Sequence, residues 1–110
     1  LSLAKAYALM RAGSTDSAVD ELRAVLTAAP EHPRAHSLLA ACLFDKGDAR
    51  AALAEAEAAL HLNESDLLGH HIAGLAHLKL KDIPRAEAAI RRAIALEPES
   101  AESHRLLGVL

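Results

Sequence analysis

Apolar residues recur every three or four positions along almost the whole chain, in blocks separated by short polar turns. This spacing places the apolar side chains of each block on one face of a helix and so predicts paired amphipathic helices. We expect helices near residues 2–12, 15–28, 33–46, 49–62, 67–80, 83–96 and 101–110.

The predicted boundaries carry the residue types that begin helices. A side-chain oxygen placed just before a helix accepts a hydrogen bond from a free backbone N–H of the first turn. Residues of this kind precede five of the predicted helices, at Ser14, Asp48, Asp66, Asp82 and Ser100. Pro33 and Pro84 fall in first turns, where a missing N–H costs little. The turns and the apolar pattern therefore agree.

The chain repeats itself with a period of 34 residues and without any insertion. A shift of one period aligns Ala18 with Ala52 and Ala86. It also aligns a set of small residues on the first helix of each pair: Ala6, Ala40, Gly74 and Gly108. Small residues let the two backbones of a pair approach closely, and a large side chain at Ala52 or Ala86 would cost about 1–3 kcal/mol or more.

The 34-residue period, the small residues, the Gly47-Asp48 turn and the segment Ala93-Ile94-Ala95-Leu96-Glu97-Pro98 resemble the tetratricopeptide repeat (TPR) family. The resemblance covers essentially the whole chain, as repeats at about 1–32, 33–66 and 67–100 and a partial fourth at 101–110. It implies an all-α fold, an α-solenoid of antiparallel helix pairs with three repeats plus one extra helix. The pairs would stack into a right-handed superhelix whose concave face is lined by the first helices.

Charge and composition exclude several classes of function. The formal net charge is −3, and the basic residues are scattered among acidic ones. Nucleic-acid binding is disfavoured because it usually needs a basic patch. No run approaches the roughly 18–20 apolar residues of a membrane span, so we expect no direct membrane insertion. A single cysteine, Cys42, fits a reducing compartment, and a cytoplasmic location is favoured.

The histidines and carboxylates do not form a recognisable catalytic or metal site. His36, His70 and His104 share one column of the repeat, so consecutive members lie on different helices, about 8–10 Å apart, too far to share a zinc ion. We expect these rings to fill half-buried slots, and we expect Glu55 and Glu57 to be solvated. No motif for phosphate binding or nucleophilic catalysis is present. The chain is predicted to be non-enzymatic and to need no cofactor or metal.

The remaining candidate is a peptide-binding groove on the concave face. The resemblance implies that the groove is lined by Tyr7, Met10, Arg11, Ser37, Ala41, Phe44, Asp45, His71, Leu75, Leu78, Lys79 and Arg105. In the best-known groove of the family, lysine, asparagine and arginine grip a C-terminal carboxylate. Those places here hold Leu3, Tyr7, Leu38, His71 and Leu75, so binding of a chaperone tail is disfavoured. The apolar character suits an amphipathic helix or an apolar extended segment.

Two other functions stay open. The final helix ends in the apolar run 106–110, so either more chain follows or another molecule covers this end. The repeats would then be a structural segment that self-associates through its apolar ends. Alternatively, they are an accessory domain of an enzyme that lies elsewhere in a longer chain.

Overall fold

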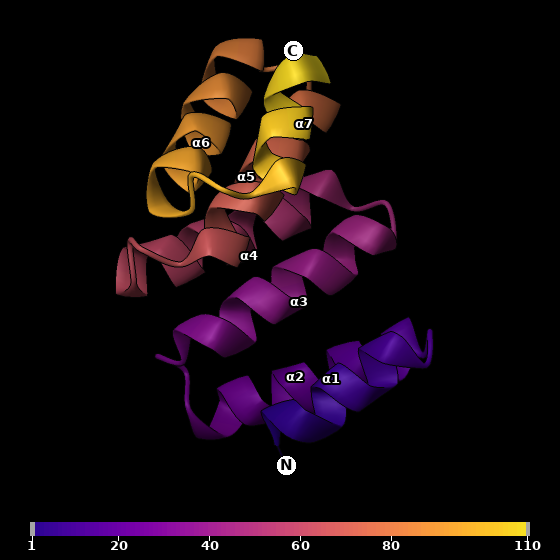
Figure 1. Ribbon diagram of the computed structural model, residues 1–110. Coiled ribbons are helices and arrows are strands. Elements are labelled where there is room, and N and C mark those ends of the chain that lie inside the picture. Colours follow the sequence, from indigo (N-terminus) through magenta and orange to yellow (C-terminus); the bar gives the residue numbers. More distant parts are fainter. Residues whose placement is uncertain (1, 110) are drawn as a thin grey trace.

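The computed structural model describes residues 2–109, which form seven α-helices and no strand (Figure 1). The helices are α1 (Leu3–Arg11), α2 (Thr15–Ala28), α3 (Pro33–Asp45), α4 (Ala49–Leu62), α5 (Leu67–Lys79), α6 (Ile83–Leu96) and α7 (Ala101–Val109). Every predicted helix is present, and each observed end lies within one residue of its prediction. None of these helices is long and apolar enough to cross a membrane.

Consecutive helices pack in pairs, and the pairs stack along one direction. Helix α1 packs on α2, α3 on α4 and α5 on α6, while α7 packs on α6. The two termini lie at opposite ends of the stack (Figure 1), which measures 37 × 24 × 24 Å. The prediction of an all-α helical-repeat fold with three helix pairs and one extra helix is therefore confirmed.

The core explains why small residues recur within the pairs. Ala6, Ala40 and Ala52 are fully buried among larger side chains such as Leu22 and Leu39. At Gly74 the two helices of the third pair approach closely, since an added Cβ would lie 2.8 Å from Cγ1 of Ile90. Real Cβ atoms do not approach so closely, so glycine at this position permits the observed packing.

The predicted caps form at four of five helix starts. Asp48, Asp66 and Asp82 accept hydrogen bonds from the backbone N–H three residues later, at 3.0, 3.2 and 3.3 Å, and Ser100 does the same at 3.2 Å. The prediction for Ser14 is wrong, since its side chain makes no capping bond. Asp48 and Asp82 have backbone angles near those of Ser14. Backbone conformation therefore does not distinguish Ser14 from the aspartates that cap their helices.

The turn inside each helix pair requires a left-handed backbone. Gly13, Gly47 and Lys81 occupy equivalent positions one period apart and have φ angles of +78°, +90° and +64°. Glycine adopts this conformation without steric cost, whereas a residue with a Cβ is strained by about 1–2 kcal/mol. The third pair therefore keeps the turn geometry of the other two at some cost in stability.

Candidate functional site

All twelve residues predicted for the groove lie on the first helices α1, α3, α5 and α7, and these residues differ in burial. Five of the twelve residues are exposed: Tyr7, Arg11, Asp45, Lys79 and Arg105. Five more are half-buried: Met10, Ala41, Phe44, Leu75 and Leu78. Helix α3 contacts α5 directly as well as its own partner α4. Side chains of α3 and α5 therefore belong to one continuous surface.

The apolar members of this set form what we call the first-helix surface, defined by Tyr7, Met10, Phe44, Leu75 and Leu78. Tyr7 is 41% exposed and is the only aromatic among the four large apolar side chains that are exposed in residues 2–109. Met10, Phe44 and Leu75 lie against the buried core from outside. These five residues thus combine anchored side chains with one aromatic ring that is open to a partner.

A shallow hollow on α1 brings two of the predicted residues together. It has a volume of about 370 Å³ and is lined by Ala4, Tyr7, Ala8 and Arg11. The two alanines leave room beside the tyrosine ring, and the Arg11 guanidinium stands at the same hollow. An aromatic face next to a cation offers both apolar contact and a hydrogen-bond donor.

Two of the twelve predicted residues are buried, so their side chains are not open to a partner in this structure. Ser37 is fully buried, and its hydroxyl donates to the backbone oxygen of Arg34 at 3.1 Å. His71 is also buried, and its Nε2 is hydrogen-bonded to the Ser103 hydroxyl of α7. The periodic pattern placed both residues on the correct helices, but neighbouring elements cover them.

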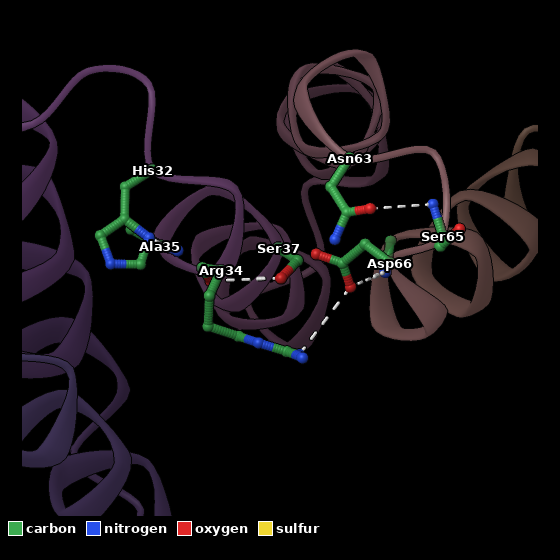
Figure 2. A network of polar contacts seen from close by, with 8 residues as sticks. His32, Arg34, Ala35, Ser37, Asn63, Ser65 and Asp66 are labelled. Atoms are coloured by element: carbon green, nitrogen blue, oxygen red, sulfur yellow. Dashed lines mark hydrogen bonds and ion pairs between the residues drawn. The ribbon is translucent and has the colours of Figure 1, made fainter.

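A polar network fixes the start of α5 against α3 (Figure 2). The Asp66 carboxylate, with a side chain only 2% exposed, accepts from the N–H of Gly69 at 3.2 Å and lies 3.8 Å from the Arg34 guanidinium. Figure 2 shows the Arg34 side chain reaching from α3 toward Asp66. The Asn63 side chain accepts from the N–H of Ser65 at 3.1 Å in the same loop. Together these contacts hold two successive first helices in register.

The histidine column makes the same hydrogen bond in the second, third and partial fourth repeats. Nε2 of His36, His70 and His104 lies 2.7, 2.8 and 2.8 Å from a backbone carbonyl oxygen six residues earlier, belonging to Pro30, Glu64 and Pro98 respectively. A carbonyl oxygen only accepts, so each ring carries its proton on Nε2 and donates. Each ring thereby ties a first helix to the loop before it.

The second ring nitrogen of His36 contacts Glu55, which corrects the prediction that this carboxylate is solvated. Nδ1 of His36 lies 2.8 Å from Glu55 Oε1, and the Glu55 side chain is 26% exposed. One period earlier, Glu21 accepts from the N–H of Ser2 at 3.1 Å and lies 3.4 Å from the Lys5 ammonium. A carboxylate of α2 therefore contacts the start of α1, and a carboxylate of α4 contacts the start of α3. Glu87 and Arg91, four residues apart on α6, form a surface ion pair at 2.9 Å.

Candidate chemistry is sparse across residues 2–109. No group of three or more histidine, cysteine, aspartate or glutamate side chains is arranged to hold a metal ion there. Cys42 is 1% exposed, and its burial, with a smaller contribution from the Asp45 carboxylate, raises the pKa of the thiol. A thiol in such surroundings is a poor nucleophile.

Stacked antiparallel helix pairs with a 34-residue period and small residues at the pair contacts define a helical-repeat solenoid. A sequence profile described as tetratricopeptide repeat matches residues 3–66 and 73–110. The chain belongs to the tetratricopeptide repeat family, whose members are protein-binding scaffolds. None of the curated proteins matches the sequence.

Several solved structures, two of them of TPR domains, superpose closely on this chain. The first TPR of Spaghetti (RPAP3), bound to the HSP90 peptide SRMEEVD, has 24% identity and a TM-score of 0.91, with 96% of this chain and 83% of that chain covered. The Sgt2 TPR domain from Aspergillus fumigatus has 25% identity, a TM-score of 0.89 and coverages of 96% and 72%. PcrH, in complex with the chaperone-binding region of PopD, has 23% identity, a TM-score of 0.81 and coverages of 96% and 80%.

Proposed function

We propose that this protein is a non-enzymatic scaffold that binds an amphipathic helix or an apolar peptide segment across its first-helix surface. The observation that carries the proposal is the exposure of Tyr7 beside a hollow on α1, with half-buried apolar side chains at equivalent repeat positions of the following first helices. Aromatic side chains that are anchored at one edge and open at the other are frequent centres of protein interfaces.

Similar domains support the class of partner. The first TPR of Spaghetti (RPAP3) binds a peptide of HSP90, and PcrH binds a region of PopD. The peptide seen with RPAP3 ends in Glu-Glu-Val-Asp and is strongly acidic. The places where the family grips a C-terminal carboxylate hold Leu3, Tyr7, Leu38, His71 and Leu75 here, and His71 is already bonded to Ser103. The proposed ligand is accordingly an apolar segment and not an acidic tail.

Peptide binding with a matched pair of variants tests this proposal. Peptides selected from a displayed library of amphipathic helices are labelled, and their affinity is measured by fluorescence anisotropy. Tyr7→Ala should weaken binding about tenfold or more, since truncating a central aromatic commonly costs more than about 1 kcal/mol. Ile83→Ala is the control, because Ile83 is 42% exposed but lies at the start of the second helix α6.

The outcome also depends on helix content, measured by circular dichroism. Both Tyr7→Ala and Phe44→Ala should keep the helicity of the parent protein while binding more weakly. Loss of helicity in both variants would mean that the rings are core residues. Equal binding by the parent protein and Tyr7→Ala would also refute the proposal.

The second candidate is self-association through apolar ends. Leu106 and Leu107 of α7 are only half-buried, whereas the side chains of Val109 and Leu110 lie outside the described residues. Sedimentation equilibrium over a concentration series discriminates the two functions. A monomer at high concentration rejects self-association, and a dimer that Leu107→Lys dissociates supports it.

A further inference from the structure

Two hollows on the stack are equivalent by the period of the repeat. The first, of about 410 Å³, lies between α2, α3 and α4, and the second, of about 360 Å³, lies between α4, α5 and α6. Leu26, His36 and Glu55 line the first hollow, and the residues 34 positions later, Leu60, His70 and Ala89, line the second. The two hollows thus share a histidine at the same place but differ in the charged residues around it, among them Glu55 against Ala89 and Arg23 against Glu57.

In the first hollow the histidine is fully engaged. His36 Nε2 donates to the Pro30 carbonyl at 2.7 Å, and Nδ1 lies 2.8 Å from Glu55 Oε1. A carbonyl oxygen and an ionised carboxylate only accept, so this arrangement is complete when both ring nitrogens carry a proton. The ring and Glu55 then form a charge-assisted hydrogen bond within the repeat.

In the second hollow the same ring lacks its carboxylate. His70 Nε2 donates to the Glu64 carbonyl at 2.8 Å, but Ala89 stands where the first hollow has Glu55. His70 is 5% exposed, and Nδ1 makes no hydrogen bond with any residue from 2 to 109. Every fully buried side-chain nitrogen or oxygen in residues 2–109 has a hydrogen-bond partner. Because Nδ1 of His70 has none, this atom is not fully buried. The position of the missing carboxylate is therefore open.

The second hollow, which lacks the carboxylate, has an additional cation in Arg92. Arg92 lines the second hollow, whereas the equivalent position one period earlier is Ala58. The Arg92 guanidinium is exposed and forms no ion pair with the residues that the structure describes. Arg85 lines the hollow too, but Asp82 holds it at 3.0 Å.

The other titratable groups facing this hollow are Glu57, Glu64 and His77. The two carboxylates oppose the binding of an anion, so the affinity for one carboxylate should be weak, in about the millimolar range. They do not occupy the Glu55-like position, because neither makes a hydrogen bond with His70 Nδ1.

We propose that the second hollow binds a glutamate or aspartate side chain of a polypeptide partner. Its carboxylate would take the position that Glu55 holds in the first hollow and would contact His70 Nδ1 and the Arg92 guanidinium. The source is a side chain because the carboxylate that contacts the equivalent ring in the first hollow, Glu55, is a glutamate side chain. Nε2 keeps its proton for the Glu64 carbonyl, so binding adds one proton at Nδ1 and weakens as the pH rises. This site is independent of the first-helix surface.

The test uses the blocked peptide acetyl-Ala-Glu-Ala-amide as a probe, with sodium succinate at equal ionic strength as a second probe. Imidazole ¹⁵N resonances follow His70 during the titration, and calorimetry in buffers of different ionisation enthalpy counts protons. We expect one bound peptide and about tenfold weaker binding at pH 8 than at pH 6, which corresponds to the uptake of about half a proton averaged over this range. Arg92→Gln should weaken binding several-fold.

Two further variants use the internal repeat as its own control. Ala89→Glu supplies the missing carboxylate from α6 and should abolish binding, whereas Ala101→Glu adds the same charge at an exposed position of α7 and should not. Glu55→Ala opens the first hollow and should add a second site that is weaker, because Ala58 stands there in place of Arg92.

Several outcomes would overturn the proposal. These are no response of the His70 ring, unchanged binding in Arg92→Gln, or peptide binding by a folded Ala89→Glu variant with the parent affinity. Succinate binding as tightly as the peptide would keep a carboxylate site but reject a polypeptide as its source. Tyr7→Ala should leave peptide binding at this hollow unchanged, so failure of this proposal and failure of the proposed function are distinguishable.

Discussion

The close approach of Gly74 to Ile90 predicts that Gly74→Ala destabilises the parent protein but stabilises a variant that lacks the Ile90 side chain. Ile90 is fully buried, and a methyl group at position 74 would lie 2.8 Å from its Cγ1 and 3.6 Å from the carbonyl oxygen of Ala86. Equivalent positions in the second repeat hold Ala40 and Ala56, so a larger first-helix residue accompanies a smaller second-helix residue there. The third repeat has the opposite arrangement.

Two opposing effects set the magnitude for Gly74→Ala. Replacing a glycine inside a helix by alanine gains about 0.5–1 kcal/mol, whereas overpacking a closed core costs about 1–3 kcal/mol. With Ile90 in place, the overpacking cost exceeds the gain in helix propensity, and we expect destabilisation of about 1 kcal/mol. In the Ile90→Ala background the obstruction is absent, so Gly74→Ala should stabilise by about 0.5–1 kcal/mol.

The assay is a double-mutant cycle, with free energies of unfolding from urea titrations followed by circular dichroism. Ile90→Ala alone should cost about 2–5 kcal/mol, because it leaves a cavity between α5 and α6. Gly108→Ala is the matched control, since an added Cβ there meets nothing within 4 Å and should not destabilise. Equal effects of Gly74→Ala in both backgrounds, within about 0.5 kcal/mol, would refute the close approach as the reason for glycine.

Two further predictions concern helix starts and acid. Asp48→Ala should lower the free energy of unfolding by about 1 kcal/mol, because it removes the capping hydrogen bond to Ala51. Ser14→Ala is the control, since Ser14 makes no capping bond, and it should change the free energy of unfolding by less than about 0.5 kcal/mol. Equal urea midpoints for the two variants would contradict this prediction. Hydrogen bonds from the N–H groups of Ser2 and Arg85 lower the pKa values of Glu21 and Asp82 below 4.5 and 3.8 respectively. The two ionised carboxylates stabilise the fold fully at pH values above their ordinary pKa values, and this stabilisation is lost as the pH falls through their lower folded-state pKa values. Urea midpoints should therefore decrease below about pH 4.5. The decrease should be less steep in the double variant Glu21→Gln/Asp82→Asn.

The helices and their order could be predicted from the sequence because local rules determine them. Apolar spacing, capping aspartates and prolines in first turns act within a few residues, and the period of 34 gives each signal more than once. Asp66 illustrates this, since its capping bond to Gly69 follows from local sequence alone. The observed ends therefore agree with the predicted ones.

Contacts between helices were less predictable because they depend on how the pairs cross. Glu55 and His36 are 19 residues apart, and nothing local indicates that the carboxylate turns toward the ring. One signal was available: Glu21 and Glu55 are one period apart on second helices, which marks them as equivalent. Likewise, the pattern placed His71 on the predicted face of α5, but its burial depends on Ser103 of α7.

The bond from each column histidine to the carbonyl six residues earlier gives the fold a modular joint. The segment 33–66 begins with the donor, His36, and ends with the acceptor carbonyl, at Glu64, that the next repeat uses. A copy of this segment inserted in register would supply a histidine donor to the repeat before it and a carbonyl acceptor to the repeat after it. Array length can thus change by whole units of the period without the design of a new junction, which is how a chain of this kind can lengthen by duplication.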